Sequence, residues 1–362
     1  MATLASATLK LWIYDGLINS YTGTPQYTIT KSKILGETTI LFEISELIKD
    51  YVQVSFDGDY DAAKLSSWAS FEITNTFDDT PNPTTTITKG TRLVTHGYGY
   101  FEDEINPQLT TPLQQSNTCI FWKKGEKVRI PLYKENQLYS VEFFEGATST
   151  SSQTFGKTII DLTADTTDYR ADTMLIRADA NQIMSGNSKS ITSGINATVG
   201  TDKVVITTDD NKTVTLSITY VEECKNTPYK VTFLNKFGSL QDIWFFGRRR
   251  ESANVTREEY KINTVEATTT TKFYPTYSPT NRVHNLESDK SLVLNTGFIC
   301  EEYNEVVQQM MQSEYVWIHE NNRVYPVTPS DNNIEYKNER YDKLLNFTVR
   351  FDYAFSELNS VR

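Results

Sequence analysis

The last part of the chain alternates strictly between apolar and polar positions. From residue 344 to residue 355, every second residue is large and apolar: Leu345, Phe347, Val349, Phe351, Tyr353 and Phe355. A period of two is typical of a β-strand that buries one face. We therefore expect Phe347, Val349 and Phe351 to be buried. We also expect this amphipathic strand to lie at a sheet edge or to join a neighbouring subunit.

Residues 226–250 predict two strands around a tight turn. Val231 and Phe233 alternate with polar residues, and the sequence Asn-Lys-Phe-Gly follows at 235–238. The next apolar run is bulky enough for a core or a subunit interface, and three arginines follow it. Aromatic residues and arginine are enriched at protein interfaces. The candidate interface residues are therefore Trp244, Phe245, Phe246, Arg248, Arg249 and Arg250.

Two alternatives apply to this candidate interface. Trp244 and Phe246 could fill the core of their own domain and leave only the arginines outside. The arginines could also meet DNA phosphates or acidic lipids, since they are the main concentration of positive charge. Because Glu251, Glu258 and Glu259 are close in the sequence, a salt-bridged contact between subunits is the favoured interpretation.

Short strand-like runs separated by turn residues recur along most of the chain. Helical spacing of apolar residues is found at 43–51 and 301–312, and Asn321-Asn322 predicts a two-residue hairpin turn. We therefore predict a mainly β protein with a few short helices. Its two β-sandwich or barrel-like domains are expected at residues 1–155 and 226–362. A Thr/Ser/Asp-rich β insert or subdomain is expected at 156–225.

Composition and charge narrow the class of protein. The chain has 362 residues, 12% of them aromatic, which is enough for two or three domains with buried cores. Its 35 basic and 46 acidic residues give a net charge of −11, which argues against general nucleic-acid binding because phosphate contacts supply most non-specific affinity. No membrane-spanning run and no secretion signal is found in the sequence. We expect the protein to be made in a cytosol.

The sequence contains few groups with recognisable chemistry. Cys119, Cys224 and Cys300 are far apart and odd in number, so we expect buried free thiols. The three histidines lie in separate segments without metal-ligand spacing. The acidic residues at 57–61 lack the glycine and the twelfth-position carboxylate of a calcium loop. We expect no catalytic residue, no bound cofactor and no metal site.

Residues 226–250 resemble a segment of tail and neck structural proteins of tailed bacteriophages. In those proteins a strand ends in a Leu-Asn-Lys-Phe/Tyr-Gly turn and an aromatic strand follows. The sequence Leu-Asn-Thr-Gly-Phe at 294–298, the helical stretch, the hairpin at 315–327 and the closing strand extend the resemblance over about residues 220–362.

This resemblance implies a non-enzymatic virion structural protein in a symmetric tail, neck or baseplate assembly. Its expected location is the virion, after assembly in the host cytoplasm. Its expected partners are other copies of itself and other virion structural proteins, with passive contact to passing DNA and no membrane. An acidic surface suits a channel wall along which DNA slides.

Two other functions remain open from the sequence. The 21 tyrosines suit stacking on sugars, as in a carbohydrate- or receptor-binding module. The carboxylates Glu102, Asp103 and Glu104 could serve as the acid and base of a polysaccharide hydrolase.

Overall fold

The computed structural model describes most of the chain outside the Thr/Ser/Asp-rich stretch. The described residues are 3–15, 21–59, 65–78, 83–98, 120–124, 126, 139–145, 148–155, 203–208, 213–263, 265–267, 271–273, 275–331, 345–356 and 358. Strands make up 56% of the structure and helices 7%, which confirms a mainly β protein with several antiparallel sheets. No closed barrel is found among these residues. Much of the predicted insert, residues 156–202 and 209–212, lies outside them.

The first sheet is an antiparallel set of four strands in the order β2-β1-β3-β4. Its strands are β1 (Thr3–Tyr14), β2 (Tyr27–Ser32), β3 (Ser66–Asp78) and β4 (Thr84–Thr95). Leu11 and Ile13 of β1 are buried together with Ile48 of the short helix α1 (Ser45–Lys49) and with Val52. The predicted helical stretch at 43–51 therefore covers one face of this sheet.

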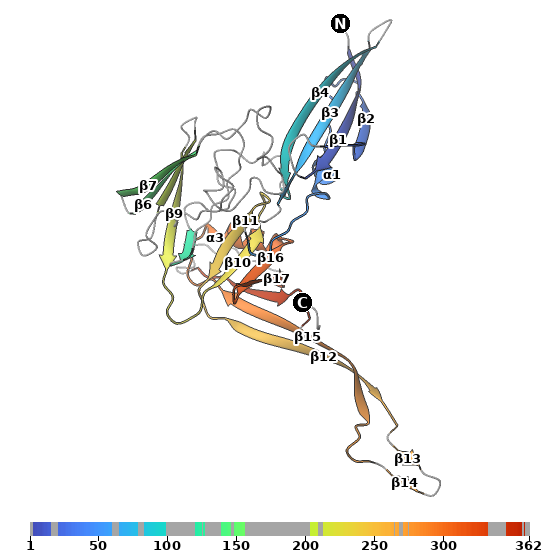
Figure 1. The fold of residues 1–362 in the computed structure, drawn as a ribbon, viewed down its shortest axis with the longest axis vertical. Helices are drawn as coiled ribbons and strands as arrows, with labels where there is room; N and C mark the ends of the chain where they lie inside the picture. Colours follow the sequence, from blue (N-terminus) through green and yellow to red (C-terminus); the bar gives the residue numbers. More distant parts are fainter. Residues whose placement is uncertain are drawn as a thin grey trace.

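The largest sheet has seven strands in the order β11-β10-β16-β17-β18-β15-β12 (Figure 1). They are β10 (Tyr229–Leu234), β11 (Leu240–Phe245), β12 (Arg250–Lys261), β15 (Asn281–Asn295), β16 (Val316–Glu320), β17 (Arg323–Pro329) and β18 (Thr348–Tyr353). The predicted helix is found as α3 (Tyr303–Gln312), and it packs on this sheet. Asn321 and Asn322 form the β16–β17 turn with φ values of 52° and 60°, which confirms the predicted hairpin.

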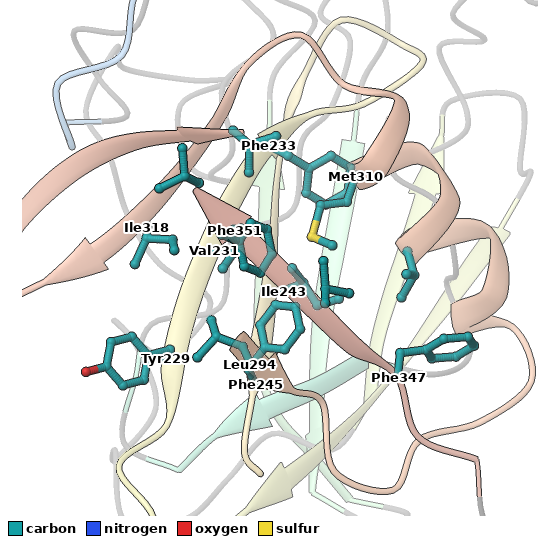
Figure 2. Packing of buried hydrophobic residues seen from close by; sticks show 14 of the residues in the cluster. Tyr229, Val231, Phe233, Ile243, Phe245, Leu294, Met310, Ile318, Phe347 and Phe351 are labelled. Carbon is teal, nitrogen blue, oxygen red and sulfur yellow. The ribbon is translucent and has the colours of Figure 1, made fainter. Parts of the chain in front are cut away.

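The main core lies between α3 and one face of this sheet. Val231 and Ile243 from the strands and Met310 from the helix belong to one buried cluster, and all three are fully buried (Figure 2). The helix contributes Met310 because its apolar residues recur every three to four positions and form a single buried stripe.

Strand β18 lies inside the seven-stranded sheet. Phe347, Val349 and Phe351 are buried, with exposed fractions of 6%, 2% and 0%, so the burial prediction is confirmed. The expectation that this strand forms a sheet edge or joins a neighbour is wrong. Antiparallel partners, β17 and β15, occupy both of its hydrogen-bonding edges.

A third sheet has five strands in the order β5-β9-β8-β6-β7. They are β5 (Ile120–Lys123), β6 (Tyr139–Glu145), β7 (Thr148–Phe155), β8 (Lys203–Thr208) and β9 (Thr213–Val221). Strand β5 runs parallel to β9, and the other pairs are antiparallel. Strands on both sides of residue 155 therefore share one sheet.

Strand β5 also attaches this third sheet to helix α3. The backbone N–H of Phe121 donates a hydrogen bond to the hydroxyl of Tyr303 at 3.1 Å, and the two rings meet edge to face. Burial raises the pKa of Tyr303 to about 12. Because the charged form is disfavoured inside the protein, ionisation of Tyr303 opposes the folded state.

We expect this group to make the fold sensitive to alkali. A tyrosine in the unfolded chain ionises near about pH 10. The stabilisation from neutral Tyr303 is therefore complete below that pH, and it is lost as the pH rises toward about 12. In urea unfolding at stepped pH, Tyr303→Phe should be less stable than the parent at neutral pH, because the Phe121 N–H loses its acceptor. The difference in unfolding free energy between the two proteins should become smaller in alkali. A difference that does not change with pH would contradict the buried, neutral state of Tyr303.

A compact turn at residues 235–239, between β10 and β11 of the largest sheet, forms hydrogen bonds with the end of the first sheet. Asn235 accepts hydrogen bonds through Oδ1 from the backbone N–H groups of Phe237 (3.0 Å) and Ser239 (3.2 Å). The hydroxyl of Thr95 donates to the carbonyl of Phe237 at 2.9 Å, and the N–H of Tyr98 donates to the carbonyl of Lys236 at 2.8 Å. The end of β4 is therefore held by backbone carbonyl groups of the turn.

The described cysteines differ from the sequence expectation of buried free thiols. Cys224 is free but exposed, and Cys300 is disulfide-bonded, so that expectation is wrong for both. Cys119 lies outside the described residues. Spacing along the chain could not show this difference, because disulfide formation depends on the distance between thiols in the fold.

Candidate assembly surface

The aromatic residues of the predicted interface lie in the core of their own chain. Trp244, Phe245 and Phe246 have exposed fractions of 5%, 1% and 4%. The ring of Phe245 meets that of Phe351 edge to face at 5.8 Å, and Trp244 meets Trp122 of β5 in the same way at 6.1 Å. These three side chains therefore stabilise the fold of the monomer and leave the arginines as the exposed part of the segment.

The three arginines lie where the chain leaves the core and enters β12. All three are exposed, and Arg249 forms an ion pair with Glu251 at 3.4 Å. The guanidinium group of Arg249 also lies 5.2 Å from the ring centre of Tyr229, which fixes this side chain. Neither Arg248 nor Arg250 forms an ion pair with any residue that the structure describes. Their charges are available to a partner.

Beyond these arginines, β12 and β15 form a two-stranded arm. Figure 1 shows the two strands leaving the rest of the sheet, with the small hairpin of β13 (Glu266–Ala267) and β14 (Lys272–Phe273) at the far end. All 12 residues of β12 are exposed. Within the described part of the chain, β12 pairs only with β15, so its outer edge has backbone groups that are open to another strand.

The arm exposes large apolar side chains among its charges. The exposed fractions are 41% for Val255, 47% for Tyr260, 49% for Val283 and 41% for Leu286. An arm of two strands cannot bury these side chains by itself, because it lacks a second layer. Exposed apolar side chains grouped in this way are typical of a surface that contacts another protein.

The sequence pattern does not predict the arm, although Glu258 and Glu259 are close to the arginines in the sequence. The sequence Arg-Glu-Ser-Ala-Asn-Val-Thr-Arg-Glu-Glu-Tyr-Lys at 250–261 has no apolar alternation, because neither face of β12 packs on a core. Such an arm could be predicted from a long polar run that contains β-branched and aromatic residues and lies close in the sequence to another predicted strand.

Among the described residues, the other candidate catalytic and metal-binding side chains of the sequence do not come together. Glu102, Asp103 and Glu104 lie outside the described residues. The part of the chain that is described contains no cluster of three or more His, Cys, Asp or Glu that could hold a metal ion. The same residues include no helix long and apolar enough to cross a membrane.

Comparison with known proteins adds no assignment. No family model, no curated protein and no solved structure matches this chain.

Proposed function

We propose that this chain is a non-enzymatic structural subunit of a symmetric tail, neck or baseplate assembly in a tailed bacteriophage. The observation that carries the proposal is the exposed arm of β12 and β15, which has no core of its own (Figure 1). The resemblance of residues 226–250 and of the following helix, hairpin and strand supports the phage class. We further propose that the first and the largest sheets belong to two sandwich-like domains, and that residues 156–225 are an insert whose strands β8 and β9 join β5, β6 and β7 in the third sheet.

In this proposal, the chain acts by associating with copies of itself and with other virion proteins. The arm supplies a strand edge that has no partner strand among the described residues, and exposed apolar side chains. At its root lie Arg248 and Arg250, which form no ion pair with a described residue. The net charge of −11 suits a surface that DNA passes without binding. No step of this function needs a bound cofactor, a metal or a membrane.

Imaging of virions and native mass measurement test the proposal directly. Electron microscopy of virions labelled with an antibody against the chain should place the label at one fixed level of the tail or neck. Native mass measurement should find assembled copies. Absence of the chain from purified virions would exclude the proposal.

We expect charge reversal at the root of the arm to block incorporation into particles. Replacing Arg248, Arg249 and Arg250 with Glu should leave the thermal unfolding of the isolated chain nearly unchanged, because the three side chains are exposed. Incorporation should fall strongly, since the change places like charges against an acidic partner. Quantitative blotting of purified particles measures the effect.

A matched control reverses the same amount of charge elsewhere. Arg92, Lys225 and Arg323 are also exposed, and they lie outside β12 and the segment before it. Replacing these three with Glu should leave incorporation normal. Equal incorporation of both triple variants would show that the arginines at the root of the arm face only solvent and do not contact a partner.

Carbohydrate binding is the second candidate function, and one observation favours it. Trp12, Tyr14 and Tyr21 form an aromatic cluster on the first sheet, with ring centres 5.0 and 5.6 Å apart. Partly exposed aromatic rings can stack on sugar faces. A glycan array with the parent chain and with Trp12→Ala tests this function. Binding that is lost in Trp12→Ala would support it.

A further inference from the structure

A hydrogen-bonded turn in the first domain presents two large apolar side chains to solvent. The N–H of Glu37 donates to the carbonyl of Ile34 at 3.1 Å, and Gly36 has a φ of 92°. These features define a β-turn with a glycine at the position that requires positive φ. Ile34 is 65% exposed and Leu35 is 100% exposed. We call residues 34–36 the apolar turn.

Hydrogen bonds hold both ends of the loop that contains the apolar turn. The N–H of Lys33 donates to the carbonyl of Ala5 at 2.9 Å, which holds the start of the turn against β1. The ammonium group of Lys31 donates to the carbonyl of Leu41 at 2.9 Å and lies 5.3 Å from the ring centre of Phe42. Because both ends of the loop are held, little conformational entropy is lost when the turn is buried by a partner.

The arm carries a matching apolar surface. Arg257 pairs directly with Leu286 across the two strands, and Glu259 pairs with Val283; the register shifts between Glu258 and Glu259, where β15 has one extra residue, so Leu286 and Val283 face two alternate residues of β12 although they are three positions apart. Paired residues of antiparallel strands lie on the same face, and so do residues two positions apart along β12. Val255, two positions before Arg257, therefore shares this face with Leu286 and Val283. We call these three apolar residues the arm stripe.

The charges beside the two surfaces complement each other. The apolar turn lies between a cation, Lys33, and an anion, Glu37. Leu286 and Val283 of the arm stripe likewise lie beside a cation, Arg257, and an anion, Glu259. None of these four charged groups forms an ion pair with another described residue. In one relative orientation, Lys33 meets Glu259 and Glu37 meets Arg257.

The two surfaces cannot meet within one chain. Figure 1 shows the outer end of the first sheet, where the chain begins, and the arm at opposite ends of the molecule. The contact between Lys33 and Ala5 places the apolar turn beside the start of β1. A contact between the apolar turn and the arm stripe would therefore need a second copy of the chain.

We propose that the apolar turn of one copy docks on the arm stripe of the next copy, in a head-to-tail contact. Such a contact uses two different surfaces, so it generates a ring when the rotation between neighbours closes. The proposal rests on the self-association included in the proposed function, and it names the surfaces that carry it.

Two single substitutions test the contact with the full-length chain. Leu35→Asp places a charge in the apolar turn, and Leu286→Asp places a charge in the arm stripe. Each should weaken self-association by about tenfold to a hundredfold, since a large aliphatic side chain loses its burial. Analytical ultracentrifugation over a concentration series measures the effect. Ile87→Asp, at another exposed apolar position (58%) in β4, is the matched control and should assemble like the parent.

Mixing the two variants distinguishes a head-to-tail contact from other forms of association. Each variant retains one intact surface. At a concentration at which the parent assembles and each variant alone is monomeric, an equal mixture should therefore form dimers and nothing larger. Dimer formation also shows that both variants are folded. Failure of the mixture to form dimers, assembly of either variant alone at parental strength, or a parent chain that stays monomeric would overturn the contact.

A charge exchange gives an independent readout. Lys33→Glu and Glu259→Lys should each weaken self-association, and the double variant should recover it. Absence of recovery would contradict the orientation proposed here. Incorporation of Leu35→Asp into particles at normal occupancy would reject this contact but leave the proposed function intact. Absence of the parent chain from particles would reject the proposed virion function. The mixing experiment would then still test the contact between copies.

Discussion

Replacing Phe351 with alanine is expected to lower the free energy of unfolding by about 3–5 kcal/mol. The side chain is fully buried in β18, and its ring meets that of Phe245 edge to face at 5.8 Å. It lies among the other buried residues between the sheet and α3 (Figure 2), where neighbouring strands on both sides prevent collapse of the cavity. Urea unfolding followed by tryptophan fluorescence measures the loss.

Arg350→Ala, one position earlier in the same strand, is the control for this experiment. Arg350 is exposed, and its ion pair with Asp352 (3.2 Å) lies at the surface. Such pairs contribute about 0–1 kcal/mol, so the control should remain close to the parent. Similar midpoints for Phe351→Ala and Arg350→Ala would contradict the central position of β18.

The second large effect is expected at Asn235, which is 1% exposed. Asn235→Ala removes the acceptor of the Phe237 and Ser239 N–H groups and of the Ser239 hydroxyl (3.1 Å). It also removes the donor to Gln241 Oε1 (3.2 Å). Each buried polar group that loses its partner costs about 1–3 kcal/mol. We therefore expect a total loss of at least about 3 kcal/mol in chemical unfolding.

Asn235→Asp separates the acceptor from the donor. The aspartate keeps an oxygen for the N–H groups of Phe237 and Ser239 but cannot donate to Gln241, so its stability should fall between those of the parent and the alanine variant. Hydrogen exchange at Tyr98, whose N–H is bonded to the same turn, should become faster in Asn235→Ala. Unchanged exchange at Tyr98 would mean that the turn does not hold the end of β4.

The sequence predicted elements well where one face alone is buried. The alternation from 345 to 355 correctly predicted which side chains of β18 are buried, and the spacing at 301–312 predicted α3. It could not predict the position of β18 inside the sheet, because periodicity reports which face of a strand is buried and not which strands flank it. The two asparagines predicted their hairpin because few other residues accept positive φ.

Prediction from sequence was weaker where both faces of a strand are covered. In β10 and β11 the face opposite α3 is also buried, since Leu234 and Leu240 pack with Phe56 and Trp317. Burial on both faces removes the alternation. The run from 243 to 246 therefore looks the same whether it fills a core or an interface. The arm presents the opposite case, because a strand without a core leaves no apolar pattern at all.

The junction between the first sheet and the largest one has a consequence for how the sequence can diverge. Lys236 and Phe237 hold β4 through their carbonyl groups, so substitutions of their side chains leave these hydrogen bonds in place. A Cβ atom added at Gly97 would lie 2.7 Å from the Lys236 carbonyl oxygen, and one added at Gly238 would lie 2.7 Å from the Cβ of Thr95. Homologues should therefore vary freely at 236 and 237 while both glycines resist replacement. A pair of invariant glycines would mark this junction in an alignment even where the residues between the two sheets have changed.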